Sequence, residues 1–236
     1  MNCYIKLTIL VVILTSELAN AWQLIGTGVN YKEFANSDSN NVLIAYAGYN
    51  VNQAQTNAWS DRLMLKSTLK NSQYGIKHVY SVRGPQDVYY NAKEIQNSKL
   101  IAHLYGLMAS ANAAPKLIVI LSHSSGTYVT DEFFTQLYNK MAANPNDSIY
   151  RALRKRIVFY NLDGGTVPTR KDDAYINTLF GAINFVWASK GSLSSMNAAG
   201  MINAKNSYSK TLNIKSVEVV ANKAQCTNSK CLHDAV

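Results

Sequence analysis

The chain has 236 residues, of which 47% are hydrophobic and 16% are charged, a composition that is typical of globular proteins and excludes an intrinsically disordered one. The formal net charge is +9, but the basic residues are scattered along the chain, which argues against a nucleic-acid-binding protein. The favoured interpretation is a solvated basic surface, and the alternative is attraction to anionic membranes or acidic glycans.

The first 21 residues have the organisation of a secretory signal peptide. Lys6 supplies a positive charge, Leu7–Leu14 form a short apolar run, and Ala19–Ala21 fit the small-x-small cleavage pattern. The run is shorter than the roughly 20 residues needed to span a bilayer, although an uncleaved membrane anchor is the alternative. We expect cleavage after Ala21, which would leave residues 22–236 as one secreted domain, extracellular or periplasmic.

After the leader, apolar strand-like runs alternate with stretches of helical spacing. The expected strands are Val42–Ala47, Lys77–Val82, Leu117–Leu121, Arg156–Leu162, Ile183–Ala188 and Ile214–Ala221. The expected helices are Ala58–Asn71, Asn91–Asn112 and Thr127–Ala143. Near-continuous apolar strands separated by helices predict an α/β fold class with a mostly parallel central sheet and helices on both faces. The segment Ser189–Asn213, rich in Ser, Asn and Gly, is interpreted either as a surface loop or as a mobile cover over the site.

The segment Ser122–Gly126 (SHSSG) joins the end of the third strand to the start of the third helix. This is the context of a nucleophile elbow, in which Ser124 Oγ is raised above the carboxyl edge of the sheet. The turn is sharp, so the residues two before and two after the nucleophile must be small, and Ser122 and Gly126 meet that need. The pattern predicts Ser124 as the nucleophile of a serine hydrolase.

A serine hydroxyl needs an imidazole to accept its proton and an acid to orient that imidazole. His78 and His103 precede the elbow and are interpreted as structural or surface residues, and the side chain of His123 should point away from the nucleophile. His233 remains; it follows the last expected strand, where the base is expected in the chain order Ser, acid, His.

The acid should lie on a loop after a strand between Ser124 and His233. Asp163 satisfies this condition because the strand that ends at Leu162 leads directly into it. Asp172 and Asp173 are alternatives, but they lie in a polar run with no strand before them.

The oxyanion formed during acyl transfer needs N–H donors that are already aimed at it. One candidate donor is the backbone N–H of Ser125, at the start of the helix after the elbow. The other is the backbone N–H of Tyr49, in the loop after the first strand, where Gly48 permits a tight backbone.

Two cysteines remain after cleavage of the leader, Cys226 and Cys231, and the secreted environment is oxidising. We expect a disulfide between them, which would close a small loop and mainly fix its local geometry. The alternative is a metal site, but neither a CxxC spacing nor a His cluster supports one, so no metal is expected.

These motifs resemble those of the α/β-hydrolase superfamily, and within it the lipases. Residues 122–126 resemble the lipase GHSxG elbow with Ser122 in place of the first Gly. The Asn161–Asp163 segment resembles the Gly-Leu-Asp segment that carries the acid in pancreatic-type lipases. Ala47–Tyr49 resemble their His-Gly-Phe oxyanion loop without the His. The resemblance covers Val42–His233, and it implies hydrolysis of carboxylic esters through an acyl-enzyme without metal or organic cofactor.

The sequence therefore predicts a secreted lipase or esterase acting on an ester or lipid substrate. One alternative is a catalytically inactive binding protein with the α/β-hydrolase fold. Another is a different doubly wound protein in which SHSSG is a phosphate-binding turn at a helix N-terminus. That turn lacks the Gly-rich spacing and the Lys of a P-loop, which counts against the last alternative.

Overall fold

The computed structural model describes residues 21–34, 39–65, 74–86, 92–164, 182–188 and 214–219, the last two ranges as backbone. The strands are β1 (Gln23–Gly26), β2 (Val29–Glu33), β3 (Asn41–Tyr46), β4 (Ile76–Val82), β5 (Ile118–His123), β6 (Ile157–Leu162), β7 (Ala182–Ala188) and β8 (Ile214–Val219). The helices are α2 (Gln53–Leu65), α4 (Asn97–Ala109), α5 (Gly126–Ala143) and α6 (Ser148–Arg154). None of these helices is long and apolar enough to cross a membrane.

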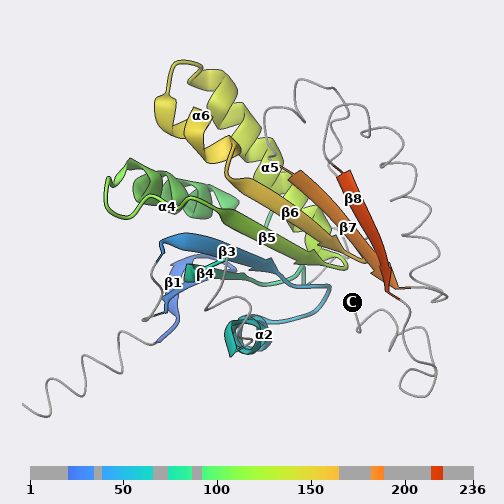
Figure 1. Cartoon of the computed structure of the whole chain (residues 1–236). Coiled ribbons are helices and arrows are strands. Elements are labelled where there is room, and N and C mark those ends of the chain that lie inside the picture. Colours follow the sequence, from blue (N-terminus) through green and yellow to red (C-terminus); the bar gives the residue numbers. More distant parts are fainter. Residues whose placement is uncertain are drawn as a thin grey trace, which may run out of the picture.

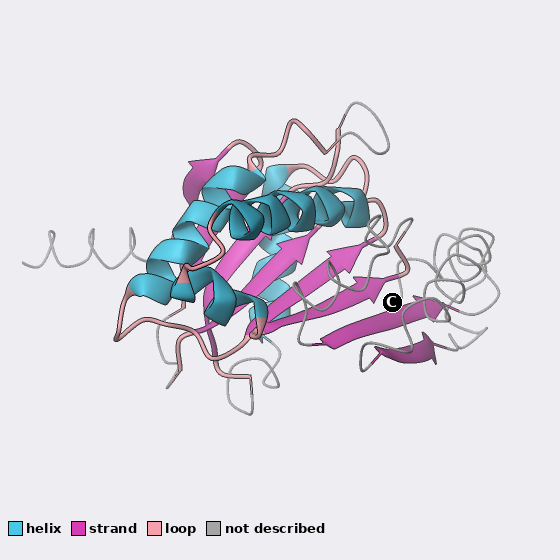
Figure 2. Cartoon of the chain, turned by 90° about the horizontal axis from the view of Figure 1, so that it is seen from above, coloured by secondary structure: helices cyan, strands magenta, loops and turns pink. Residues whose placement is uncertain are grey.

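The eight strands form one sheet in the order β1-β2-β4-β3-β5-β6-β7-β8. All neighbours from β4 to β8 are parallel, whereas β1 and β2 form an antiparallel hairpin whose second strand pairs antiparallel with β4. Figure 2 shows the arrowheads of the parallel strands pointing toward one edge of the sheet. The predicted fold class, a mostly parallel sheet with helices on both faces, is confirmed.

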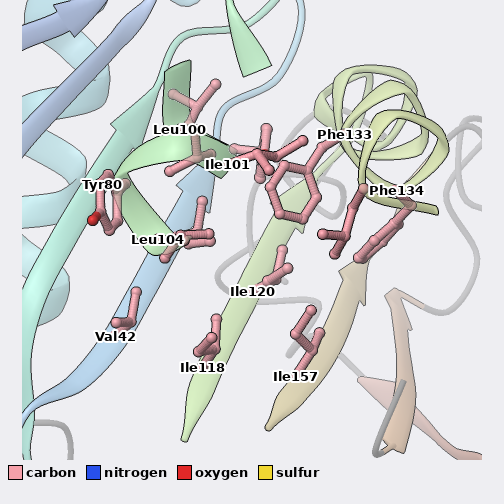
Figure 3. Close-up of a cluster of buried hydrophobic side chains, with 14 of the residues drawn as sticks. Val42, Tyr80, Leu100, Ile101, Leu104, Ile118, Ile120, Phe133, Phe134 and Ile157 are labelled. Carbon is pink, nitrogen blue, oxygen red and sulfur yellow. The ribbon is translucent and has the colours of Figure 1, made fainter. Parts of the chain in front are cut away.

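The helices cover both faces of the sheet, with α2 on one side and α4, α5 and α6 on the other (Figure 1). On the larger side, α4 and α5 send apolar side chains onto alternate residues of β3, β5 and β6 (Figure 3). The labelled contacts include Val42, Ile118, Ile120 and Ile157 from the strands and Leu104, Phe133 and Phe134 from the helices. The intervening strand residues, such as Leu43 and Val119, pack on Met64 of α2. Strands that are buried on both faces explain why their sequences read as continuous apolar runs.

The β1–β2 hairpin, α6 and the starts of α2 and α4 differ from the sequence prediction. The β1–β2 hairpin was not expected, because its strands are short and mix polar with apolar residues. Helix α2 begins at Gln53, five residues before the expected start, because Asn52 and Gln55 form a capping box. Gln55 N–H donates to Asn52 Oδ1 at 2.9 Å, and Asn52 N–H donates to Gln55 Oε1 at 3.0 Å. Helix α4 begins six residues later than expected, after a turn that precedes Asn97.

A cluster of tyrosines and histidines lies between β2, β4 and α4. The Tyr31 hydroxyl is 2.8 Å from Nδ1 of the buried His78, and the Tyr80 hydroxyl is 3.0 Å from Nδ1 of His103. The rings of Tyr31 and His103 make an edge-to-face contact with centroids 4.8 Å apart. Burial lowers the pKa of both imidazoles; for His78, Lys77 and His103 add to the lowering and Glu33 opposes it. Both histidines are therefore structural residues, His78 in the sheet and His103 on α4.

This cluster predicts that the protein loses stability as the pH falls below about 6.5, the ordinary pKa of histidine. Below that pH the unfolded chain binds more protons than the folded protein, because the pKa of His78 and His103 is lowered in the folded state. The contribution of the two neutral histidines to the free energy of unfolding is complete above the pKa that they have in the unfolded chain. It declines as the pH falls toward their lower pKa in the folded protein. Thermal unfolding between pH 7.5 and 5.5 should show a falling Tm, and His78→Gln should flatten that dependence. An unchanged slope in this variant would contradict the assignment.

Candidate active site

Ser124 lies at a sharp turn between β5 and α5. Strand β5 ends at His123 and helix α5 begins at Gly126, so only two residues make the connection. The φ angle of Ser124 is 53°, in the left-handed region that non-glycine residues rarely adopt. Ser124 N–H donates to Leu162 O at the end of β6, at 3.1 Å, and the Thr127 hydroxyl donates to Ser124 O at 2.8 Å. These bonds hold the backbone of Ser124 in a conformation that costs about 1–3 kcal/mol.

The small residue two positions after Ser124 is needed because the start of α5 touches the end of β3. A Cβ added to Gly126 would lie 2.5 Å from the carbonyl oxygen of Ala47 and 2.8 Å from that of Tyr46. Any side chain at Gly126 would push the helix away from the sheet and displace the turn.

Ser122, two positions before Ser124, is fully buried and faces α5. Its hydroxyl accepts a hydrogen bond from the Thr130 hydroxyl at 2.8 Å, and the same Thr130 hydroxyl lies 3.0 Å from Gly126 O. The hydroxymethyl group that distinguishes SHSSG from a GHSxG elbow is thus accommodated by a polar contact within the fold.

We expect Thr130→Val to lower the free energy of unfolding by about 1–3 kcal/mol, because it leaves the buried Ser122 hydroxyl without its donor. Ser122→Ala combined with Thr130→Val should be less destabilised than Thr130→Val alone, since neither partner then remains unsatisfied. Urea denaturation of the two single variants and the double variant measures this coupling. Simple additivity would show that the two hydroxyls do not interact.

Asp163 follows β6 directly and is completely buried. Its φ angle is 45°, and the turn behind it is closed by Gly164 N–H, which donates to the Asn161 side-chain oxygen at 2.8 Å. A Cβ on Gly164 would collide with the methyl group of Thr127 on α5, so the Asp163 turn packs against the elbow. His123 and Leu162 are paired in the register of the adjacent parallel strands β5 and β6. Ser124 and Asp163 each come directly after these residues, so both lie at the same edge of the sheet.

The loop after β3, residues 47–52, lies against Ser124. A Cβ on Gly48 would be 3.1 Å from Ser124 Cβ, so a side chain here would require the loop or Ser124 to shift by a few tenths of an ångström. Tyr49, the next residue of the loop, is 42% exposed. Asn50 has a φ angle of 57°, and its N–H donates to Pro85 O at 2.9 Å.

Residues 83–86 brace this loop from β4. Gly84 N–H donates to Val51 O at 3.2 Å, and a Cβ on Gly84 would collide with the carbonyl of Gly48. Arg83 forms an ion pair with Glu94 at 3.0 Å. The hydrogen bonds that Glu94 accepts from the Arg83 guanidinium and from Gln86 N–H hold the pKa of its carboxyl below the ordinary value. The ion pair ties the end of β4 to the segment before α4.

Three non-glycine residues of the described chain have a positive φ angle: Asn50, Ser124 and Asp163. All three follow the carboxyl ends of strands that are neighbours in the sheet, β3, β5 and β6. Such conformations persist where the surrounding structure enforces them, and they concentrate at active sites. The strained positions therefore coincide with the predicted oxyanion loop, nucleophile and acid.

Among the pockets lined by described residues, two differ in their relation to the elbow. One of about 530 Å³ lies beside the elbow, between the Gly48 loop, His123 and α2. A smaller one of about 290 Å³ lies between the end of α5 and α6, and none of its lining residues belongs to the elbow. The larger pocket is therefore the one next to the predicted chemistry.

The other predicted residues, His233, Cys226 and Cys231, lie outside the described residues, as does the segment Ser189–Asn213. Where the chain is described, no group of three or more His, Cys, Asp or Glu side chains is placed to hold a metal ion.

Several supporting residues were not anticipated from the sequence. They are Thr127, Thr130, Asn161, Gly84 and the Arg83–Glu94 pair. Thr130 could have been found from helical periodicity, because it lies one turn after Gly126 on the face of α5 that packs against the sheet. The brace from β4 carries no sequence signal, since it joins residues that only the sheet brings together.

No protein-family model matches the sequence, and no curated protein matches it significantly. Among solved structures, the chain is similar to a carboxylesterase from Mesorhizobium loti, with 12% identity, a TM-score of 0.47 and coverage of 85% of this chain and 90% of that one. It is also similar to a peroxisomal α/β-hydrolase from Saccharomyces cerevisiae (10% identity, TM-score 0.46, 82% and 75% coverage). A third is esterase B from Lactobacillus rhamnosis (8% identity, TM-score 0.44, 98% and 91% coverage).

The fold assignment rests on the chain's own geometry. A hairpin leads into a parallel sheet, and a serine with positive φ joins β5 to α5. A buried aspartate follows the adjacent strand β6, and a glycine loop after β3 lies against the serine. This arrangement has the backbone geometry expected of a nucleophile elbow. The chain has the α/β-hydrolase fold.

Proposed function

We propose that the protein is a secreted serine hydrolase that cleaves carboxylic esters, as a lipase or esterase, through an acyl-enzyme on Ser124. The observation that carries this proposal is the backbone strain at Ser124. A serine is held at φ 53° on a two-residue turn, with Gly48 packed against it and Asp163 on the adjacent strand. A merely structural turn would more easily use glycine at that position.

In the proposed reaction, Ser124 Oγ attacks the ester carbonyl carbon and its proton passes to Nε2 of His233. The backbone N–H groups of Tyr49 and Ser125 stabilise the negative oxygen of the tetrahedral intermediate. Ser125 is suited to this because it precedes the first turn of α5, where backbone N–H groups have no partner within the helix. The bond to the alcohol oxygen then breaks as His233 returns the proton to it. Water repeats the sequence and releases the acid.

Asp163 is proposed to accept a hydrogen bond from Nδ1–H of His233 and to stabilise the imidazolium that forms. A fully buried carboxylate is costly unless a hydrogen-bonding or charged group compensates it. The role proposed for Asp163 provides that compensation during the reaction. The Cys226–Cys231 disulfide is proposed to hold the loop that carries His233.

The test is covalent labelling of the intact protein with a fluorophosphonate probe, followed by peptide mapping. One equivalent of probe should attach to the peptide that contains Ser124, and labelling should stop after denaturation because the activated hydroxyl depends on the fold. Hydrolysis of 4-nitrophenyl esters should disappear in step with labelling. A folded protein that neither labels at Ser124 nor hydrolyses any ester would be a binding protein on the same fold.

A further inference from the structure

The 530 Å³ pocket opens beside the elbow on the face of the sheet that α2 covers. Its inner wall consists of Ala47, Gly48 and Val51 from the loop that touches Ser124, together with His123. His123 belongs to this face because side chains alternate along β5, and Ser122 before it is hydrogen-bonded to α5 on the other face. The pocket is thus lined by His123, which directly precedes Ser124, and by Gly48, which lies against it.

The outer wall of the pocket is one face of α2, formed by Gln55, Ala58, Trp59 and Arg62. These positions are spaced as neighbours on a helix surface, while Thr56, Ser60 and Met64 are buried under the helix. Gln55 lies at the loop end, where its side chain is bonded to Asn52. Arg62 is seven residues further, about 10 Å along the helix axis. Along α2 the wall therefore runs from the Gln55 amide past Ala58 and Trp59 to the cation Arg62.

The guanidinium of Arg62 is available to a ligand. Arg62 is exposed and has no ion pair with any residue that the structure describes, whereas its neighbour Asp61 is bonded to Lys32 at 2.9 Å. No acidic side chain is among the described residues of the pocket wall. An arginine presents parallel N–H donors that match a carboxylate, and the planar ring of Trp59 offers an apolar surface on the way to it.

From this arrangement we infer that the pocket binds the acyl chain of esters of dicarboxylic acids, with the free carboxylate on Arg62 and the methylene chain along Trp59. The inference rests on the proposed function, because it assumes that the ester carbonyl lies at Ser124. It adds the substrate class: a half-ester whose methylene chain is long enough to follow α2 from Gln55 to Arg62, about 10 Å along the helix axis.

The kinetic test compares 4-nitrophenyl half-esters of adipic, suberic and sebacic acids with the neutral hexanoate, octanoate and decanoate of equal carbon number. Arg62→Gln should lower kcat/KM for the suberate and sebacate half-esters about fivefold and leave the neutral esters within twofold. Arg62→Lys should restore part of the loss, and added salt should reduce the preference of the wild type. Arg151→Gln, an exposed arginine on α6, is the matched control and should change nothing.

A binding measurement separates this inference from the proposed function. Suberate should produce a saturable change in tryptophan fluorescence in Ser124→Ala, a change that Trp59→Phe abolishes and Arg62→Gln weakens. If the wild type hydrolyses esters but Arg62→Gln affects charged and neutral esters equally, the inference is wrong and the proposed function stands. If no ester is hydrolysed but suberate binds through Arg62, the proposed function fails and the carboxylate site stands. Absence of both the kinetic preference and the binding overturns the inference.

Discussion

Ser124→Ala is expected to lower kcat for hydrolysis of 4-nitrophenyl butyrate by about 10⁵- to 10⁶-fold, as removal of the nucleophile does in serine hydrolases. Without the hydroxyl no acyl-enzyme forms, and only binding and oxyanion stabilisation remain. The fold should persist, because the backbone bonds from Ser124 N–H to Leu162 O and from Thr127 N–H to Ser124 O do not involve the lost oxygen. Initial rates, with circular dichroism to confirm folding, measure the effect.

The matched control is Ser110→Ala, which removes an exposed serine hydroxyl at the end of α4 and should leave kcat unchanged. His233→Ala should cost about as much as Ser124→Ala, and the double variant should be no worse than either single one, because groups that act as a unit are not additive. Full activity in Ser124→Ala would end the nucleophile assignment. Multiplicative losses in the double variant would show that His233 does not act through Ser124.

Asp163→Asn is expected to reduce kcat by about 10⁴-fold with little change in KM, because an amide at this position favours the wrong tautomer of the base. The substitution preserves shape in a position that is completely buried, so the turn closed by Asn161 and Gly164 should survive. Rates measured from pH 6 to 9 should remain low throughout, since the loss is one of orientation and charge stabilisation. Fluorophosphonate labelling should slow in parallel.

Asp172→Asn and Asp173→Asn are the discriminating controls for this prediction, because these aspartates are the alternative acids and lie in the same part of the sequence. Both variants should retain wild-type rates. If one of them loses activity while Asp163→Asn does not, the acid of the triad is the residue in the polar run and not the one at the end of β6.

The sheet and the elbow could be predicted because both leave a local signature. Strands buried on both faces have continuous apolar sequences, as β3 and β5 do, and an elbow needs small residues at fixed positions around Ser124. Asp163 could be proposed for the same reason, since it follows a strand directly. The β1–β2 hairpin left no such signature, because a short antiparallel edge pair needs neither a long apolar run nor strict alternation.

The support of the site could not be predicted, because it depends on contacts between segments that are distant in the sequence. The contact of Gly84 with the Gly48 carbonyl and the hydrogen bond from Thr130 to Ser122 exist only once the sheet and α5 are assembled. The pocket wall formed by Trp59 and Arg62 could not be predicted either, because the apolar residues of α2 do not follow a clear helical spacing. The roles of His233, Cys226 and Cys231 remain predictions of the sequence.

Three glycines, Gly48, Gly84 and Gly126, bring main chain against main chain around the elbow, or against Ser124 itself. The position of Ser124 therefore depends mainly on backbone contacts. We expect substitutions at the pocket-facing positions of α2 to leave it unchanged. A library randomised at Ala58, Trp59 and Arg62 should thus redirect the enzyme toward new acids while turnover of a small acetate ester stays constant.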